Sequence, residues 1–193
     1  MPTTAERMLV IATEQFAEKG YAGASMRDIA SVAGTTQAAI YHHYPNKQAL
    51  YDAVLDRHFA AAIPAVLSGL SEIPDPENRL RELVQRIMTF ADADAQFRQL
   101  YLRELLEGNT ERLATLANNI YGAMQDSIAS LAKDLNDGAD VHLLLFSIIG
   151  LICHHLEARE LAMLVPGNPP DNCELATLSE HISQLLLGGI KGL

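Results

Sequence analysis

Residues 25–47 have the sequence SMRDIASVAGTTQAAIYHHYPNK, and this stretch decides the fold of the N-terminal part of the chain. Ser25 is placed to cap a helix, and Asp28 adds a favourable negative charge to the first turn of that helix. Apolar or small residues at helical spacing predict one buried face, formed by Met26, Ile29, Ala30 and Ala33. Gly34 can adopt a left-handed conformation, which predicts the end of this short helix.

A second short helix is expected after the glycine. Thr36 is its expected N-cap, so that Gln37, Ala38 and Ala39 form its first turn while Ile40 points into the core. Two short helices joined at a Gly turn are typical of a helix-turn-helix, whose second helix enters the major groove of DNA. There a glutamine can pair with an adenine, and alanines can approach a thymine methyl group.

A contact with the DNA backbone is expected where the next helix begins. Asn46 is a plausible N-cap, and Lys47 can meet a phosphate together with the helix N-terminus. Alternatives remain at this stage, because the segment could be an ordinary helical hairpin, Tyr41 and Tyr44 could be packing residues, and His42 or His43 could be solvated surface groups. The predicted DNA-binding residues are Ser25, Arg27, Thr35, Thr36, Gln37, Ala38, Ala39, Tyr41, His42 and Lys47.

The N-terminal part of the chain resembles the TetR family of transcriptional regulators. The residues that carry the resemblance are Ile11, Ala12, Phe16, Gly20, Tyr21, Ser25, Ile29, Ala30, Ala33, Gly34, Ile40, Tyr41, Tyr44, Lys47 and Leu50. The resemblance implies phosphate contacts at Ser25, Tyr41 and Lys47. It also implies that Gln37, Ala38, Ala39 and His42 face the groove. The family often has Gly-Thr where this chain has Ala38-Ala39, so Gln37 is expected to carry most of the base recognition.

The charge is divided unevenly along the chain. The formal net charge is −10, yet residues 1–50 contain four basic and four acidic residues. All of the excess acid therefore belongs to residues 51–193. We call the N-terminal helix-turn-helix region the DNA-binding head. A head without net charge has modest affinity for non-specific DNA, and a second head in a dimer would raise that affinity.

The sequence predicts a cytoplasmic protein without a membrane segment. The N-terminal MPTTAERM lacks the basic and apolar regions of a signal peptide. The longest apolar run, Leu143 to Cys153, is interrupted by Ser147 and Gly150 and is shorter than the ~18 residues of a membrane span. The chain has only two cysteines, Cys153 and Cys173, which gives no disulfide framework and suits a reducing compartment.

The whole chain is predicted to be all-α, with about nine helices and no strand pattern. The expected helices cover about residues 4–19, 26–33, 37–43, 47 to a kink or end at Pro64, 76–91 with an Asp75 cap, 94–107, 110–135 with a Thr110 cap, 141–164, and a last helix from a capping box at Asp171 and Glu174. We expect residues 1–58 to form the helix-turn-helix domain and residues 59–193 a ligand-binding and dimerisation domain.

The last two helices carry more apolar surface than a monomer needs. This predicts a homodimer in which they form a four-helix bundle, and the TetR resemblance implies the same arrangement. A monomer that buries these helices in its own core is the alternative. Two heads are also needed to bind a palindromic operator in double-stranded DNA.

The resemblance further implies that the C-terminal part binds a small-molecule effector, whose identity the sequence does not give. Candidate effector-binding residues are apolar or aromatic with a few polar atoms, although such residues taken singly are more often ordinary core: His58, Met88, Phe90, Tyr101, Tyr121, Met124, Phe146 and His155. An apolar, aromatic or cationic compound would suit this set, and the surplus of acid favours a cation.

Neither a metal site nor an active site is expected. Cys153, His154, His155 and Glu157, with His142 and His181 further away, invite a metal interpretation, but adjacent residues on a helix point about 100° apart. No phosphate loop, serine elbow or zinc-ligand spacing is present, so no cofactor is expected. The sequence thus favours a ligand-responsive repressor. The competing hypothesis is a helical enzyme or small-molecule-binding protein whose N-terminal hairpin is only structural.

Overall fold

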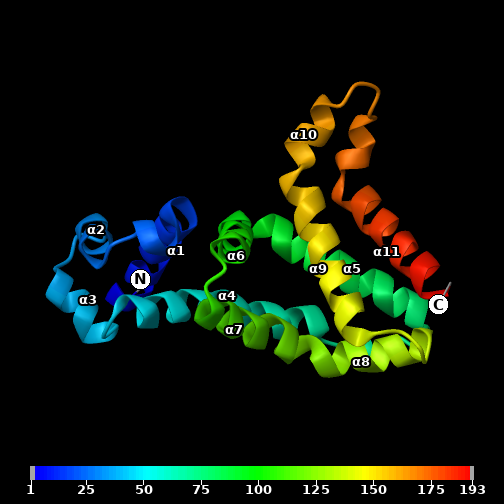
Figure 1. Cartoon of the computed structure of the whole chain (residues 1–193), viewed down its shortest axis with the longest axis horizontal. Coiled ribbons are helices and arrows are strands. Elements are labelled where there is room, and N and C mark those ends of the chain that lie inside the picture. The colour runs from blue at the N-terminus through cyan, green and yellow to red at the C-terminus, as the bar shows by residue number, and fades with distance from the viewer. Residues whose placement is uncertain (1–2, 192–193) are drawn as a thin grey trace. The chain divides into compact units, whose positions relative to one another are not determined.

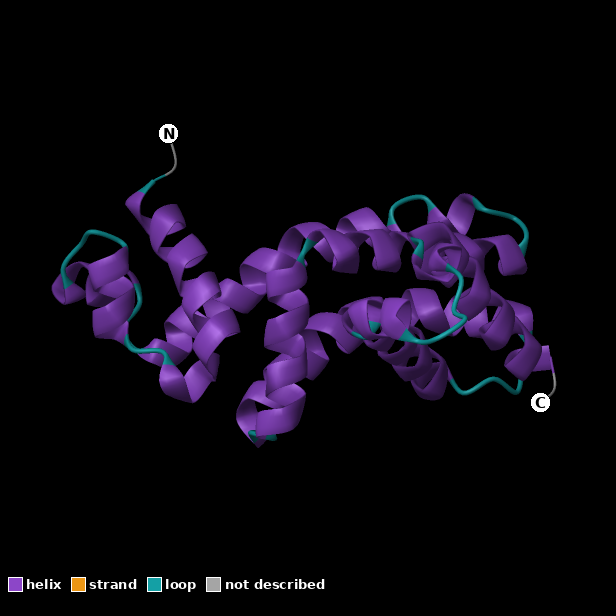
Figure 2. Cartoon of the chain, turned by 90° about the horizontal axis from the view of Figure 1, so that it is seen from above, coloured by secondary structure: helices purple, strands orange, loops and turns teal. Residues whose placement is uncertain are grey.

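The computed structural model describes residues 3–191, with residues 60, 61 and 191 described by their backbone alone (Figure 1). The described residues form helices and loops without a strand, which confirms the predicted all-α class (Figure 2). They divide into two compact units. The first contains the residues up to Ala61 together with Ala95–Asn119, and the second contains Ala62–Asp94 and the residues from Ile120 onward.

The first unit is built on the helices of the predicted DNA-binding head. It contains α1 (Thr4–Gly23), α2 (Met26–Val32), α3 (Gln37–His43), most of α4 (Lys47–Leu67), α6 (Ala95–Glu107) and α7 (Thr110–Ala117). Helix α1 packs against both α2 and α6. The core of this unit includes the fully buried side chains of Met8, Phe16, Ile29, Ile40 and Leu50. Two helices from residues 95–117 therefore belong to the same compact unit as the head.

The second unit is a bundle around α5. It contains α5 (Pro76–Ala93), α8 (Ala123–Leu135), α9 (Val141–Glu157), α10 (Arg159–Leu164) and α11 (Leu175–Lys191), with short 3-10 helices at Leu70–Glu72 and Pro170–Cys173. Helix α5 contacts α8, α9 and α11, and α9 also lies beside α11 (Figure 1). Aliphatic side chains such as Leu80, Ile148, Ile152 and Ile182 fill the core.

Two of the nine predicted helices are split in the structure, which accounts for the eleven α-helices of the described residues. The expected helix 110–135 is interrupted by a π-helical turn at Asn118–Gly122. The expected helix 141–164 is interrupted at Ala158, whose φ of −83° and ψ of 1° lie outside the α-helical range. Apolar periodicity continued across both interruptions, so the sequence pattern did not reveal them.

Three predicted helix boundaries are wrong. Asn109 rather than Thr110 caps α7, because its side chain accepts from the backbone N–H of Arg112. Asp171 lies in the 3-10 helix Pro170–Cys173, and α11 begins only at Leu175. Of the kink or end expected at Pro64, the end is wrong, because helix α4 continues through Pro64 to Leu67.

One segment among the described residues, Lys47–Glu72, is long and apolar enough by length and composition to cross a membrane. Core helices of proteins without membrane segments meet the same criterion. Five of its side chains are buried within the first unit, namely Leu50, Tyr51, Val54, Leu55 and Phe59. Packing within the protein thus accounts for the apolar character of this part of the segment.

Candidate nucleic-acid interface

Helices α2 and α3 are joined by the turn that the sequence predicts. The Ser25 hydroxyl accepts from the backbone N–H of Asp28 at 3.1 Å and so caps α2. Gly34 has a φ of +64°, and the backbone N–H of Thr35 donates to the Ala30 carbonyl at 3.0 Å. This is the hydrogen bond of a Schellman motif, which ends α2 and turns the chain toward α3.

Helix α3 presents the predicted base-contacting residues on its outer face. Thr36 caps the helix by accepting from the backbone N–H of Ala39 at 3.2 Å. Ile40 is fully buried, whereas Gln37, Ala38, Tyr41 and His42 are exposed and Ala39 is half-buried. Burial of a single apolar anchor fixes the rotation of this short helix about its axis. The side chains that remain exposed are therefore the ones predicted from the sequence to contact DNA.

Lys47 lies at the start of α4 and is held by the exit of α1. The Asn46 side chain caps α4 by accepting from the backbone N–H of Ala49 at 2.8 Å. The Lys47 Nζ lies 4.6 Å from the centre of the Tyr21 ring and donates to the Ala22 carbonyl at 3.4 Å. Partial burial, followed by the nearby Arg112 guanidinium, lowers the pKa of Lys47. Its ammonium group is thus held near the N-terminus of α4, where a phosphate would be favoured.

Arg103 on α6 fixes the end of α1. Its Nε and Nη2 atoms donate to the carbonyls of Ala17 and Glu18, both at 2.7 Å. These carbonyls lie in the last regular turn of α1, before Gly20 with a φ of +72°. A cation at a helix C-terminus is stabilising because the carbonyls there carry partial negative charge.

A buried ion pair joins α6 and α7 to α4. Glu104 is only 1% exposed, and its carboxylate accepts from the Tyr51 hydroxyl at 2.6 Å and from Arg112 Nε at 2.8 Å. Arg112 also contacts Glu107 at 2.5 Å, and its guanidinium lies 4.2 Å from the centre of the Tyr21 ring. Burial, and then the bond to Glu104, raise the pKa of the Tyr51 hydroxyl far above its ordinary value.

This network contacts the same aromatic ring as Lys47. Tyr21 lies between the ammonium of Lys47 and the guanidinium of Arg112, and its ring meets Tyr51 edge-on at 5.2 Å. The sequence analysis missed Tyr51, Glu104 and Arg112. No local signal could have identified them, because Tyr51 and Glu104 are 53 positions apart in the chain.

The predicted effector residues are divided between the two units. His58 and Tyr101 belong to the first unit, where His58 packs against the Phe97 ring at 5.6 Å. The other six belong to the second unit, namely Met88, Phe90, Tyr121, Met124, Phe146 and His155. Met88 and Met124 are buried core residues, whereas Phe146 is 57% exposed and stacks on Tyr121 at 4.4 Å. Of this set, His155 lines a pocket within the second unit.

The histidines and cysteines of the second unit form no metal cluster. Within residues 3–191, no group of three or more His, Cys, Asp or Glu side chains is placed to hold a metal ion. Cys153 and Cys173 are both buried and not joined by a disulfide. His155 instead bonds through Nδ1 to the Leu151 carbonyl at 2.8 Å and lies 5.9 Å from the His181 ring.

Two family models match the chain and together cover most of it. The model of the bacterial regulatory proteins of the tetR family matches residues 9–54. The model of the C-terminal domain of the HTH-type transcriptional dual regulator CecR matches residues 76–190, which is more than half of the chain. The first model covers α2, the turn and α3, and the second covers α5 to α11.

Individual relatives agree with both matches. The chain is 36% identical over 90 residues to the HTH-type transcriptional activator FasR of Mycolicibacterium smegmatis, a match that spans 47% of this chain and 41% of FasR. It is 25% identical to the HTH-type transcriptional repressor NicS of Pseudomonas putida over 97% of this chain and 92% of NicS. The fatty acid degradation regulator FadR from Bacillus halodurans superposes with a TM-score of 0.76 and 22% identity, covering 98% of this chain and 97% of FadR, and so shares the fold.

Proposed function

The chain belongs to the TetR family of bacterial regulatory proteins, and we propose that it is a repressor that binds a palindromic operator as a homodimer and is released by its effector. Family membership makes it a ligand-responsive, DNA-binding transcriptional regulator and not an enzyme. The hypothesis of an enzyme with a purely structural N-terminal hairpin is therefore wrong. Our proposal covers repression as the direction of regulation, the DNA contacts, the dimer surface, a domain boundary at residue 58 and a cytoplasmic location.

The exposed face of α3 is the observation that supports the DNA-binding proposal best. Gln37 is its one exposed carboxamide on the first turn, beside the small side chains of Ala38 and Ala39. A paired hydrogen bond from Gln37 to an adenine would supply most of the direct base recognition. His42 would face the groove as well, and phosphate contacts from Ser25, Arg27, Thr35, Thr36, Tyr41 and Lys47 would orient the helix there.

The outer faces of α9 and α11 support the dimer proposal. Leu143 and Phe146 on α9 and Leu185 on α11 are between 51% and 67% exposed, although all three are large and apolar. Gly150 and Gly188 are also exposed on these helices and would allow close helix packing. Two copies of such a helix pair can bury their apolar faces together as a four-helix bundle.

The DNA contacts can be tested on the full chain with an operator selected from random DNA. We expect Lys47→Ala to weaken binding to all sequences and to reduce the slope of log affinity against log salt by about 1. Gln37→Ala should instead lose about 1–3 kcal/mol of discrimination at one base pair. The control is Lys133→Ala, which removes an exposed lysine of α8. If the apo protein selects no motif, or if Gln37→Ala leaves the motif unchanged, the proposed DNA contacts are wrong.

The dimer surface can be tested by sedimentation. Phe146→Glu places a charge on the proposed interface and should shift the full chain from dimer toward monomer at micromolar concentration. The control is Leu106→Glu, because Leu106 on α6 is 87% exposed and lies outside the proposed interface. Equal sedimentation of the two variants as dimers would contradict the α9–α11 interface.

A further inference from the structure

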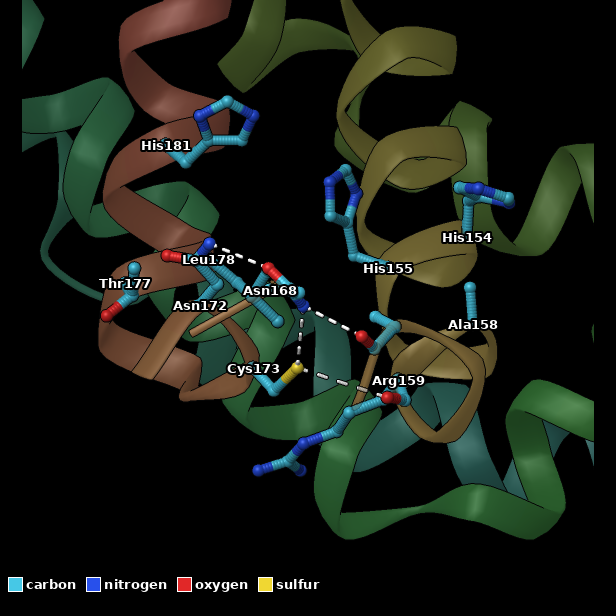
Figure 3. A pocket seen from close by; sticks show the side chains of 11 residues that line it. His154, His155, Ala158, Arg159, Asn168, Asn172, Cys173, Thr177, Leu178 and His181 are labelled. Carbon is cyan, nitrogen blue, oxygen red and sulfur yellow. Dashed lines mark hydrogen bonds between the residues drawn. The ribbon is translucent and has the colours of Figure 1, made fainter. Parts of the chain in front are cut away.

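A pocket of about 380 Å³ lies within the second unit, away from the residues proposed to bind DNA. It is enclosed by the C-terminal half of α9, by α10 with the loop that follows it, and by the start of α11 (Figure 3). Its volume is at the lower end of the range of small-molecule sites. Neither the family comparison nor the proposed DNA contacts assigns a role to it, and it borders the proposed dimer face, because His154 and His181 lie one helical turn from Gly150 and Leu185.

One wall of the pocket is tied into place by side-chain hydrogen bonds. The Asn168 Nδ2 donates to the Ala162 carbonyl at 2.8 Å, and the Asn172 Nδ2 donates to the Asn168 Oδ1 at 2.8 Å. The buried Cys173 lies beneath them, with its Sγ 4.0 Å from the Arg159 carbonyl. Polar side chains of a surface loop are usually solvated, but here they bond to one another across the loop. The wall is therefore formed before any ligand arrives.

Two neighbouring imidazole rings line the pocket, one edge-on to the other. His155 extends from α9 and His181 from α11, with their ring centres 5.9 Å apart (Figure 3). A carbonyl can only accept, so the 2.8 Å contact with Leu151 makes His155 Nδ1 a donor. This fixes the orientation of the His155 ring and leaves Nε2 as the atom for a ligand. When it is protonated, Nε2 donates to an oxyanion.

No carboxylate lines the pocket. Its ionisable lining residues are Arg159, the buried Cys173 and the three histidines His154, His155 and His181, and no Asp or Glu is among them. Two nearby carboxylates are paired with arginines: Asp92 of α5 contacts Arg159 at 3.3 Å, and Glu180 of the pocket helix α11 contacts Arg81 at 3.4 Å. The pocket thus has no carboxylate on its wall, although the chain as a whole has a net charge of −10.

We propose that this pocket binds a small organic anion whose carboxylate meets His155 and His181. The apolar part of the ligand would lie on Leu178, Ala158 and Ala162, which also line the pocket. A few convergent polar groups above an apolar floor are typical of ligand sites. The local charges thus reverse the expectation of a cationic ligand, which rested on the net charge of the whole chain. That this anion is also the effector rests on the proposed function.

Three molecules of similar shape and different charge test the proposal on the full chain, namely benzoate, benzamide and benzylammonium. The ring signals of the seven histidines report binding in NMR titrations, with assignments from single His→Gln variants. We expect benzoate to shift His155 and His181 saturably with a Kd of about 1 mM, a value typical of a fragment. Benzamide should bind about tenfold more weakly, and benzylammonium should leave both signals unshifted.

Variants locate the site. His155→Gln and His181→Gln should each weaken benzoate binding by about tenfold, as expected when a charge-assisted hydrogen bond is lost. The matched control is His142→Gln, an exposed histidine of the same helix α9 that does not line the pocket, and it should bind benzoate like the parent protein. Circular dichroism of each variant checks that the helices are retained.

Three results would overturn the proposal: no saturable shift with benzoate, tighter binding of benzylammonium than of benzoate, or equal benzoate binding by all three variants. DNA binding of the apo protein is measured separately. Failure to bind DNA would overturn the proposed function and leave the benzoate result to decide the pocket alone.

Discussion

The two compact units bury different kinds of groups. The first buries the ion pair of Glu104 with Arg112, whereas the buried polar side chains among the described residues of the second are the hydroxyls of Ser179 and Ser183. These hydroxyls bond to backbone carbonyls of their own helix, as in the 2.7 Å contact from Ser183 to Ser179. The Glu104 carboxylate instead joins three separate helices.

The two units are therefore held in shape by different interactions. Apolar packing in the second unit is adaptable, since neighbouring aliphatic side chains can shift to fill small gaps. A buried carboxylate has no such freedom, because any partner that moves away leaves a charge desolvated. We infer that the first unit uses this pair to fix the position of α4, and with it Lys47, relative to α1.

The largest expected effect comes from removing one partner of the ion pair. Glu104→Leu leaves the Arg112 guanidinium buried without its main carboxylate, and we expect the free energy of unfolding to fall by about 4 kcal/mol. Urea unfolding followed by circular dichroism measures it. The control is Glu111→Leu, an exposed glutamate of α7 that should change stability by less than about 0.5 kcal/mol.

The double variant Glu104→Leu with Arg112→Met sharpens this test. Replacing both charges by apolar groups removes the unpaired charge, so the double variant should be more stable than Glu104→Leu alone. A double variant no more stable than the single one would show that the cost comes from packing and not from an unpaired charge.

A somewhat smaller effect is expected in the apolar core of the second unit. Ile152 on α9 is fully buried, and Ile152→Ala should lower the unfolding free energy by about 3 kcal/mol through lost burial and a residual cavity. Ile152→Val removes a single methylene and should cost about 1 kcal/mol. Thermal and urea unfolding of both variants measure the two values. Equal costs would contradict a core that is stabilised by tight apolar packing.

The next largest loss of stability is expected for a substitution at Gly20, where both the backbone conformation and the lack of space disfavour a side chain. Its φ is +72°, and an added Cβ would lie 2.6 Å from the Glu107 Oε1 atom. Gly20→Ala should cost about 2 kcal/mol, part from the backbone and part from moving Glu107. Gly34→Ala is the matched control, since φ is +64° with no atom within 4 Å of the added Cβ, and it should cost about 1 kcal/mol. Equal losses in urea unfolding would show that the Glu107 side chain moves freely.

The smallest effect appears at alkaline pH. The pKa of Tyr51 is raised in the folded protein by burial and Glu104, so the folded state keeps the proton that the unfolded state loses above pH ~10. The unfolded state then binds fewer protons, and stability falls with rising pH by about 1 kcal/mol per unit from this residue. The stability of Tyr51→Phe, measured from pH 9 to 11, should therefore fall less steeply than that of the parent. Parallel slopes would mean that Tyr51 does not contribute.

The sequence predicted those features of the fold that depend on near neighbours in the chain. Ser25, Thr36, Asn46 and Asp75 cap helices as expected, since a cap bonds to a backbone N–H within three residues. The boundaries that failed have competing local signals, as at Asn109 and Thr110, where either side chain could cap the helix. At Ala158 apolar periodicity continues across the break, so no signal marked it.

The sequence by itself determined the all-α class, the caps and turn of α2 and α3, and the exposed face that carries Gln37, because these depend on spacing within one or two helical turns. Helix packing, in contrast, brings Glu104 and Arg112 to the DNA-binding head and places His155 and His181 on the wall of one pocket. These pairs come from separate helices, and the direction in which each side chain points depends on how those helices pack. The net charge of −10 therefore gave no guide to a pocket whose wall carries no carboxylate.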